Sequence, residues 1–235
     1  MKKKYLLIVI LLLIILGGCL FIFLKKDNDK PFIKQENITY NIPDNINIET
    51  YFIQNNNYLV LEIDNNTKNN IKLAELKIKF STKEQTNELS LLPSGNKSIV
   101  KVSIPTELTD NILKEKINIS LIIKEQANDI DLLDLSKLNT PKPNIEVIDN
   151  EMVIALVGKN TLEENINLLK GYVILYNNNK IVEANDFTIE NIKVNSDFNV
   201  SVKIPGIAIQ IGNENNLDYQ ILEYDKLEIY YTYAY

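Results

Sequence analysis

The sequence predicts an all-β fold built from two similar halves, and three observations lead to this prediction. From about residue 46 onward, apolar residues recur at every second position, which is the period of a strand with one buried face. The strands expected in the first half return in the same order in the second half. The chain has only seven glycines, and asparagine triplets at residues 55–57 and 177–179 stand where hairpins must turn. Asparagine suits such turns because it tolerates positive φ.

A membrane anchor is expected ahead of these strands. Lys2, Lys3 and Lys4 form a basic head over residues 1–4, and residues 5–24 carry no charge. About twenty helical residues span ~30 Å, which is the hydrocarbon thickness of a bilayer. A polar tether follows over residues 25–36 and opens with two lysines. The pattern predicts an uncleaved transmembrane helix at residues 5–24 that acts as a signal anchor.

The alternative anchor is a lipoprotein signal that ends before Cys19. Leu16-Gly17-Gly18-Cys19 resembles the bacterial lipobox, in which small residues precede an acylated cysteine. After Cys19, however, the apolar run continues over residues 20–24, where lipoproteins usually turn polar. In this alternative Cys19 is the lipid-attachment residue, whereas in the first it is a small apolar residue of the helix.

Charge and composition indicate where the rest of the chain lies. The compact basic head favours an N-terminus on the cytoplasmic side of the plasma membrane, with the rest of the chain on the outer side. From Asp27 on, the chain holds all 31 acidic residues but 20 of the 25 lysines, so its net charge is −11, which is unsuited to nucleic acid. Lysine as the sole basic residue, with abundant isoleucine and asparagine, is typical of low-GC bacteria. We therefore expect a single-pass protein of a bacterial plasma membrane whose bulk is extracytoplasmic.

The first half, residues 37–139, contains five segments in which apolar and polar residues alternate. Each is expected to form a half-buried strand. The segments are 46–52, 59–63, 76–80, 100–104 and 117–123.

The second half, residues 144–235, repeats four of these segments. The strand expected at 152–157 matches the one at 59–63, and each leads into an Asn-Thr pair, Asn160-Thr161 and Asn66-Thr67. The segment 171–176 matches 76–80, 200–205 matches 100–105, and 227–233 matches 117–123. The offset between the halves grows from 94 to 110 residues, which indicates insertions in the second half and a tandem repeat that arose by duplication.

A stiff linker is expected between the halves, because residues 140–143 read Thr-Pro-Lys-Pro. Each half then has the length and strand spacing of an immunoglobulin-like β-sandwich. The Asn-rich turn, the strand after it, Pro93-Ser-Gly-Asn-Lys-Ser98 and Val-x-Val-x-Ile-Pro together resemble the FxLYD-type immunoglobulin-like modules of Gram-positive envelope proteins. The Phe-x-Leu-Tyr-Asp signature itself is absent. The resemblance implies an extracytoplasmic module without a reaction of its own.

Several chemistries are excluded or disfavoured by residues that the chain lacks. It has no His, no Arg and no Trp, and its one Cys lies in the apolar N-terminal run. Catalysis by Ser-His-Asp or Cys-His is therefore excluded, and a protein zinc site is not expected. Neither GxxxxGK[ST] nor GxGxxG occurs, so nucleotide binding is not expected. We expect no cofactor and no metal.

The function expected from the sequence is that of a non-enzymatic binding or structural protein of the cell envelope, whose partner is an envelope protein or a glycan. One alternative is a subunit of a membrane complex that pairs through the anchor helix, where Gly17-Gly18 would allow close approach. A less favoured alternative is a hydrolase that uses carboxylates alone. Its candidates are Glu146, Glu151, Asp186 and Glu223, for which the sequence suggests no partner.

Tyrosines near the end of the chain are the candidate partner surface. Alternation along residues 227–233 assigns Tyr231 and Tyr233 to the core face and Tyr230 to the opposite face. Tyr219 and Tyr224 fall in an insertion that the first half lacks. Because tyrosine offers rigid contact area with a polar tip, we expect Tyr219, Tyr224 and Tyr230 to form one exposed patch.

Overall fold

The computed structural model describes residues 37–53, 57–127, 130–139, 142–210 and 217–235. In these ranges the chain is all-β, and its named helical segments are two 3-10 helices, η3 (Thr106–Lys114) and η4 (Leu135–Lys137). No helix within the described ranges is both long and apolar enough to cross a bilayer. The anchor expected at residues 5–24 and Cys19 lie outside the described residues.

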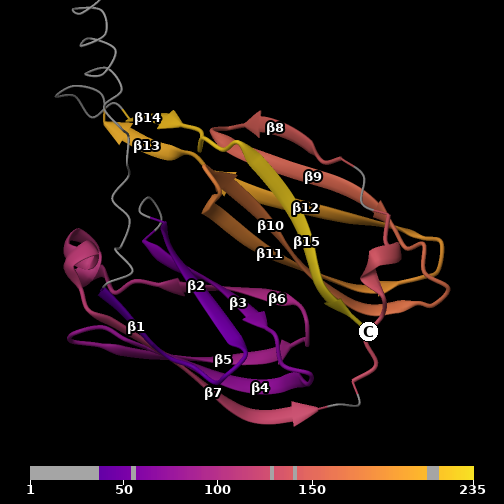
Figure 1. Cartoon of the computed structure of the whole chain (residues 1–235). Coiled ribbons are helices and arrows are strands. Elements are labelled where there is room, and N and C mark those ends of the chain that lie inside the picture. The colour runs from indigo at the N-terminus through magenta and orange to yellow at the C-terminus, as the bar shows by residue number, and fades with distance from the viewer. Residues whose placement is uncertain (1–36, 54–56, 128–129, 140–141, 211–216) are drawn as a thin grey trace, which may run out of the picture. The chain divides into compact units, whose positions relative to one another are not determined.

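The first half consists of two sheets that share one core. One sheet has the strand order β2-β3-β6 and the other β1-β7-β4-β5 (Figure 1). Apolar side chains from both sheets form a single buried cluster, as expected for two layers packed face to face. The strands are β1 (Ile38–Asn41), β2 (Ile46–Ile53), β3 (Tyr58–Asn65), β4 (Asn70–Lys79), β5 (Glu84–Leu92), β6 (Lys97–Ser103) and β7 (Ile117–Ala127).

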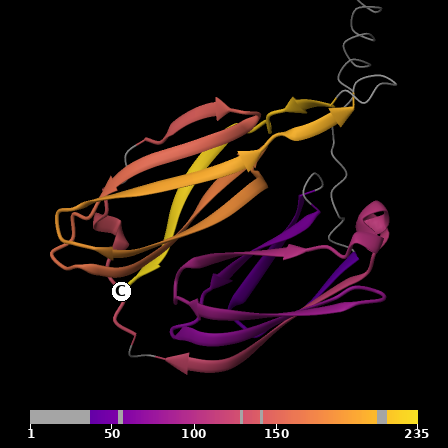
Figure 2. The ribbon, with the colours of Figure 1, turned by 180° about the vertical axis from the view of Figure 1, so that it is seen from behind.

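The second half has the same plan. Its sheets have the orders β12-β9-β8 and β11-β10-β15, and a second buried cluster lies between them (Figure 2). A short pair of strands, β13 and β14, is inserted between β12 and β15. The strands are β8 (Asn144–Ile148), β9 (Glu151–Lys159), β10 (Ile166–Asn177), β11 (Lys180–Ile192), β12 (Asp197–Pro205), β13 (Ile207–Gln210), β14 (Leu217–Gln220) and β15 (Lys226–Ala234).

The strand order of the second half therefore repeats that of the first. The order β2-β3-β6 corresponds to β8-β9-β12, and β5-β4-β7 corresponds to β11-β10-β15. The strand segments predicted from alternation all lie within or overlap observed strands. The predicted insertion is β13–β14, while β1 has no described counterpart in the second half.

A buried asparagine in each half fixes the equivalence at residue level. Asn65 at the end of β3 and Asn160 just after β9 are both fully buried. The side-chain amide of Asn65 donates to the backbone carbonyls of Asn69 and Leu92, and that of Asn160 donates to those of Glu164 and Ile192. The structural equivalent of Asn160 is therefore Asn65. The sequence comparison, which aligns Asn160 with Asn66, is wrong by one residue.

The two halves pack directly against each other. A third buried cluster joins side chains of β2, β3 and β6 to side chains of β10 and β11. The four sheets are thus separated by three apolar layers, and both halves fall in one compact unit of the chain. The strand β10 lies between two of these layers, which explains why Gly171-Tyr-Val-Ile-Leu-Tyr176 is apolar without a break. The predicted boundaries at residues 140–143 stay a prediction.

A bulge near the end of β15 changes which tyrosines face the core. Tyr231 pairs with Gly171 and Tyr233 pairs with Lys170, so two residues of β15 advance while β10 advances by one. The side that carries Leu227, Ile229 and Tyr231 continues with Ala234, which is fully buried. The prediction that Tyr233 faces the core is therefore wrong, because uninterrupted alternation was assumed across the bulge.

Candidate functional site

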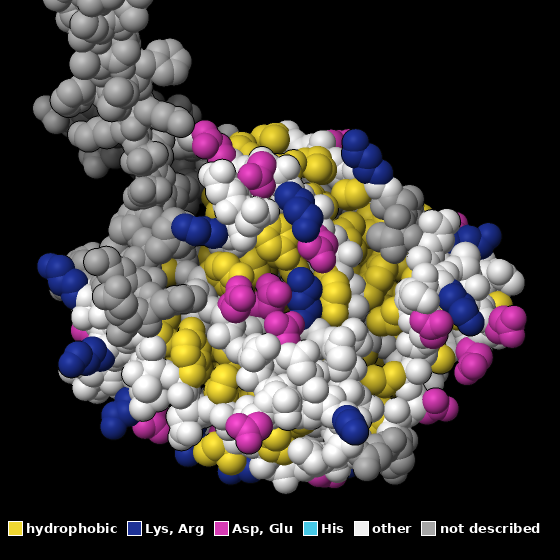
Figure 3. Space-filling view, viewed as in Figure 1, with side chains coloured by type: hydrophobic (Ala, Val, Ile, Leu, Met, Phe, Trp, Pro, Cys, Tyr) yellow, Lys and Arg dark blue, Asp and Glu magenta, His cyan; other side chains and the backbone are white. Residues whose placement is uncertain are grey.

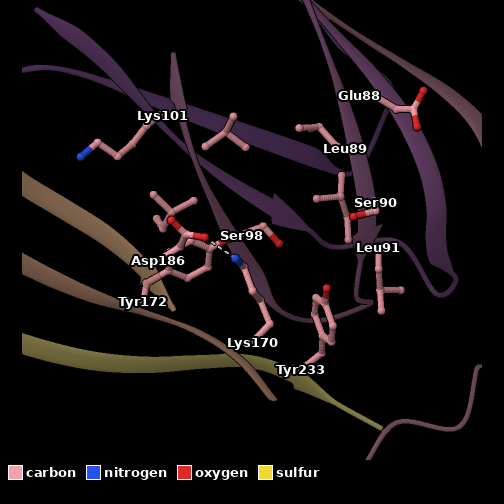
Figure 4. Close-up of a pocket in the computed structure, with 13 residues that line it drawn as sticks. Glu88, Leu89, Ser90, Leu91, Ser98, Lys101, Lys170, Tyr172, Asp186 and Tyr233 are labelled. Atoms are coloured by element: carbon pink, nitrogen blue, oxygen red, sulfur yellow. Dashed lines mark hydrogen bonds and ion pairs between the residues drawn. The ribbon is translucent and has the colours of Figure 1, made fainter. Parts of the chain in front are cut away.

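A cavity of about 230 Å³ lies where the two halves meet. The first half contributes residues of β5 and β6, and the second half contributes residues of β10, β11 and β15 (Figure 4). Hydroxyl and charged groups alternate with aliphatic ones on its wall. The polar side chains are Glu88, Ser90, Ser98, Lys101, Lys170, Tyr172, Asp186 and Tyr233.

A lysine–aspartate pair and a buried tyrosine form the polar wall from the second half. The ammonium group of Lys170 contacts the carboxylate of Asp186 on the neighbouring strand and donates to Thr188 Oγ1 at 3.2 Å. It also lies 5.8 Å from the centre of the Tyr172 ring. Burial raises the pKa of the Tyr172 and Tyr233 hydroxyls, so both stay protonated at neutral pH. This wall therefore offers hydroxyl groups as hydrogen-bond donors, next to the ammonium group of Lys170, which is already paired with Asp186.

The size and charge of the cavity limit what it can bind. Pockets for drug-sized ligands usually measure about 300–1,000 Å³. The volume of about 230 Å³ is below this range and fits a small polar group or several water molecules. The cavity is consequently suited to anchoring one side chain or one sugar ring better than to enclosing a large substrate.

Two groups of charged residues flank the apolar junction between the halves. Lys97 lies 3.3 Å from Glu62 in its own half and 3.9 Å from Glu228 in the second half. Lys101 donates to Glu183 Oε1 at 2.8 Å and to Asn185 Oδ1 at 3.3 Å, both on β11. Glu183 is only 2% exposed, so this cross-junction pair is among the least solvated in the described part of the molecule. These contacts fix the register of one half on the other.

The four carboxylates singled out from the sequence occupy separate positions. Asp186 lines the cavity, opposite Lys170. Glu146 accepts a hydrogen bond from Asn144 at 2.7 Å, and Glu151 lies 3.5 Å from Lys203. Glu223 is exposed in the segment between β14 and β15. Glu146 and Glu151 share the outer face of the β8–β9 pair, where Glu146 stands opposite Val153 and Glu151 opposite Ile148. Of the four carboxylates, only Asp186 lines the cavity.

The three tyrosines of the predicted patch also lie in different environments. Tyr219 is 43% exposed on β14, whereas Tyr224 packs against the core of the second half. Tyr230 packs against the junction cluster, and its hydroxyl accepts from the Lys97 amide at 3.1 Å and donates to Asn96 Oδ1 at 3.4 Å. These positions do not agree with the prediction that the three tyrosines form one exposed patch. The hydroxyl of Tyr230, in particular, bonds to the first half at the junction.

Sequence reasoning missed the cavity itself, since it forms between residues far apart in the chain. One signal was available in the sequence. The apolar run at residues 171–176 indicates a strand buried on both faces, and hence a second layer packed on the outer face of its sheet. No other sequence feature pointed to Lys170 or Ser98, because a single lysine or serine in a strand is usually a solvated residue.

Within the described ranges, no group of three or more Asp, Glu or Cys side chains is arranged to hold a metal ion. In the cavity, the side-chain hydroxyl groups and the lysines are the groups that could hydrogen-bond a ligand. They provide hydrogen bonds and a paired charge.

Comparisons with known proteins place this chain in no family. No family model matches it, and no curated protein matches it. Among solved structures, it is similar to red sea bream transglutaminase with a TM-score of 0.21 and 8% identity. That similarity covers 69% of this chain and 27% of the transglutaminase, so this chain matches about a quarter of that protein's length. A likeness this weak carries no argument about activity.

Proposed function

We propose that the protein is a non-enzymatic binding or structural component of a bacterial cell envelope, held at the plasma membrane by its N-terminal segment with the bulk of the chain outside. The observation that carries this proposal is the uncharged run at residues 5–24, bracketed by lysines and followed by a strongly acidic all-β region. The partner we propose is an envelope protein or a glycan.

The described region supports a binding role over a catalytic one. Of its candidate carboxylates, Asp186 lies beside Lys170 and Glu151 beside Lys203, and only Asp186 lines the cavity, so no two of them face each other across it as glycoside hydrolysis requires. The cavity at the junction is small and already contains a neutralised ion pair. Such a site favours recognition of a polar group over chemistry on a bound substrate.

The architecture also supports an extracytoplasmic module. Each half has two sheets around one core, and we propose that each is an immunoglobulin-like sandwich of the kind that recurs in envelope proteins. The described region contains no cysteine, so stability comes from three apolar layers rather than from disulfides. We propose that the four packed sheets present the binding surface as one unit.

Membrane fractionation of the full chain with labelled palmitate tests the anchor. For a transmembrane helix, we expect unlabelled, full-length protein in the membrane fraction, with no change in Cys19→Ala. For a lipid anchor, we expect label at Cys19, and Cys19→Ala blocks both labelling and cleavage. Protease added to intact cells should degrade the β region in either case. Protein that is soluble with residues 1–24 intact, or that is protected from external protease, would contradict the proposal.

A further inference from the structure

The first half contains a strand, β1, that covers the edge of its core. It runs parallel to β7, with Ile38 beside Ile117 and Tyr40 beside Ile119. Ile38 is buried in the core, and the Tyr40 hydroxyl donates to Thr50 Oγ1 on β2 at 3.0 Å. Under this cover Ile117 and Ile119 are only 1% and 0% exposed.

The corresponding edge of the second half has no such cover among the described strands. Ile229 pairs with Val173 at the position where Ile119 pairs with Ile78 in the first half. The strand β15 pairs with β10 on one side, and no described strand pairs with its other side. Leu227 and Ile229 are accordingly only partly buried, unlike their counterparts Ile117 and Ile119.

The strand β8 is the edge strand of the facing sheet and corresponds to β2, the strand that Tyr40 of β1 contacts in the first half. All five of its residues are exposed. Ile145 and Val147 stand opposite Ile154 and Met152, which are core residues, so they lie on the core side of their sheet. They are nevertheless 38% and 60% exposed. Figure 3 shows that hydrophobic side chains remain exposed among charged ones over this face of the molecule.

The opening is confined to one end of β15. At the other end, the Leu133 amide donates to the Ala234 carbonyl at 3.0 Å, and Leu133 and Leu135 pack against the core. The uncovered part therefore consists of Ile145 and Val147 on β8 and of Leu227 and Ile229 on β15. We call these four residues the open edge.

We propose that the open edge accepts an extended strand from a partner protein, which pairs in parallel with β15 and lays alternate apolar side chains over Ile229 and Val147. The model for this arrangement is β1 in the same chain, whose Ile38 and Tyr40 cover the equivalent edge of the first half. Addition of a strand to a free sheet edge is a common mode of peptide recognition, because the main chain supplies hydrogen bonds and alternate side chains supply specificity. This inference goes beyond the proposed function and does not depend on the membrane anchor.

Charge around the open edge indicates the chemistry of the partner strand. Glu146 on β8 and Glu223 and Asp225 just before β15 are all exposed. Lys226, also exposed, begins β15 and pairs with Glu228 at 3.0 Å, so acidic groups still outnumber basic ones here. An acidic border favours a strand with basic flanking residues, since complementary charge accelerates association and selects the partner. A second copy of this chain is a poorer occupant, because its own β1 is already paired with its β7.

The first test uses the full chain in detergent micelles and a labelled synthetic peptide. The peptide carries residues 37–42, Asn-Ile-Thr-Tyr-Asn-Ile, flanked by two lysines at each end. We expect saturable binding by fluorescence anisotropy. A peptide with proline in place of Tyr40 loses one main-chain donor and the alternating pattern, and should bind at least about tenfold more weakly. Equal binding of both peptides would overturn the proposal.

A matched pair of variants locates the binding. Val147 and Val157 are valines on adjacent strands with similar exposure, 60% and 57%, but Val157 lies on the outer side of its sheet. Val147→Lys places a charge in the open edge and should weaken peptide binding at least about tenfold, whereas Val157→Lys should leave it unchanged. Both variants should keep the wild-type unfolding midpoint, because the side chains are exposed. Equal loss in both, or no loss in Val147→Lys, would refute the assignment.

The direction of the bound strand is a separate test. In the first half, the N-terminal residue of β1 pairs with the first residue of β7. A photo-crosslinker at the N-terminus of the peptide should therefore label the chain near Leu227, and one at the C-terminus should label it near Tyr231. The reverse pattern would contradict parallel pairing. Light scattering should show a monomer at the concentrations used; a dimer abolished by Val147→Lys would assign the open edge to a second copy and overturn the partner-strand proposal.

Discussion

Asn65 and Asn160 show how a single buried amide closes the same turn in both halves. The carbonyl oxygen of each side chain accepts a backbone amide two residues ahead, from Thr67 and Leu162, while the NH₂ group donates to carbonyls of distant segments. Such an asparagine replaces backbone pairing where a strand ends, and leaves few buried polar groups unsatisfied. This use explains why an asparagine-rich chain with seven glycines can still turn sharply.

Replacing either buried asparagine should therefore destabilise its half. For Asn65→Ala and Asn160→Ala we expect a loss of about 1–3 kcal/mol in the free energy of unfolding, because buried backbone carbonyls lose their donors. Asn66→Ala is the control, since Asn66 is exposed beside Asn65. Urea unfolding monitored by tyrosine fluorescence measures the effect. A loss in Asn66→Ala as large as in Asn65→Ala would show that the assigned hydrogen bonds are not the cause.

Lys101 and Glu183 give a second prediction at this scale. Lys101→Met removes the ammonium group that lies 2.8 Å from the carboxylate of Glu183, which is 2% exposed, and should cost about 3–5 kcal/mol. The double variant Lys101→Met with Glu183→Leu removes both charges and should recover most of that loss. Thermal unfolding of the three proteins forms the comparison. A double variant less stable than Lys101→Met would contradict the expectation that the buried carboxylate left without Lys101 is the cause of the loss.

At the level of the strand, Gly171 allows the aromatic packing on β10. A Cβ atom there would lie 2.3 Å from Phe187 Cζ and 2.8 Å from the Tyr230 carbonyl oxygen. The ring of Phe187 thus crosses the strand where Gly171 has no side chain, and it contacts Tyr231 edge-on with centroids 5.9 Å apart. The bulge in β15 begins beside Gly171, so one glycine is associated with both the ring and the change in register.

Gly171→Ala should accordingly be destabilising. The added methyl group meets a backbone atom as well as a ring, so the strand must shift, and we expect a cost of about 1–3 kcal/mol in unfolding free energy. Gly95 provides the contrast, because its surroundings are open and only its φ of +71° is special. Gly95→Asn should be close to neutral, since asparagine tolerates that φ. Equal stability of Gly171→Ala and wild type in urea titrations would contradict the packing argument.

Across the whole molecule, the junction between the halves is apolar at its centre and tyrosine-rich at its border. Ile53, Val60, Ile99 and Ile174 form the centre, with Tyr172, Tyr176 and Tyr230 around them. Burial is the main cause that raises the pKa of all three tyrosines, and it brings that of Tyr176 to about 12. The folded state therefore holds phenolic protons that the unfolded chain releases near pH 10.

This difference predicts that the protein loses stability in alkali. Below pH 10 the tyrosines are protonated in both states, and their contribution is fully present. As pH rises from 10 toward 12, the unfolded state loses protons first, so the free energy of unfolding falls. Urea titrations between pH 8 and 11.5 should show this decline, and Tyr176→Phe should reduce its slope. A slope unchanged in Tyr176→Phe would exclude that tyrosine as a contributor.

The alternation of apolar residues was sufficient to predict the all-β class and nine of the strands, because period-two burial is a local property of a strand. The other six strands of the described region, β1, β5, β8, β11, β13 and β14, were not predicted individually. β5 and β11 carry polar residues on much of their length, so neither shows clean alternation. β8 does alternate, but it is only five residues long and directly follows the proline-rich segment. The anchor and Cys19 were predicted from sequence and stay predictions.

The repeat of strand order could be inferred from the sequence, but the contacts between the repeats depended on tertiary structure. Val60 and Ile174 belong to strands whose other face is also buried, and only the docking of one half on the other makes them core residues. The cavity at the junction, the position of Tyr233 and the uncovered side of β15 arise in the same way. Each depends on which segments distant in the chain meet, or on a bulge that changes register, and neither is encoded in the local period of apolar residues.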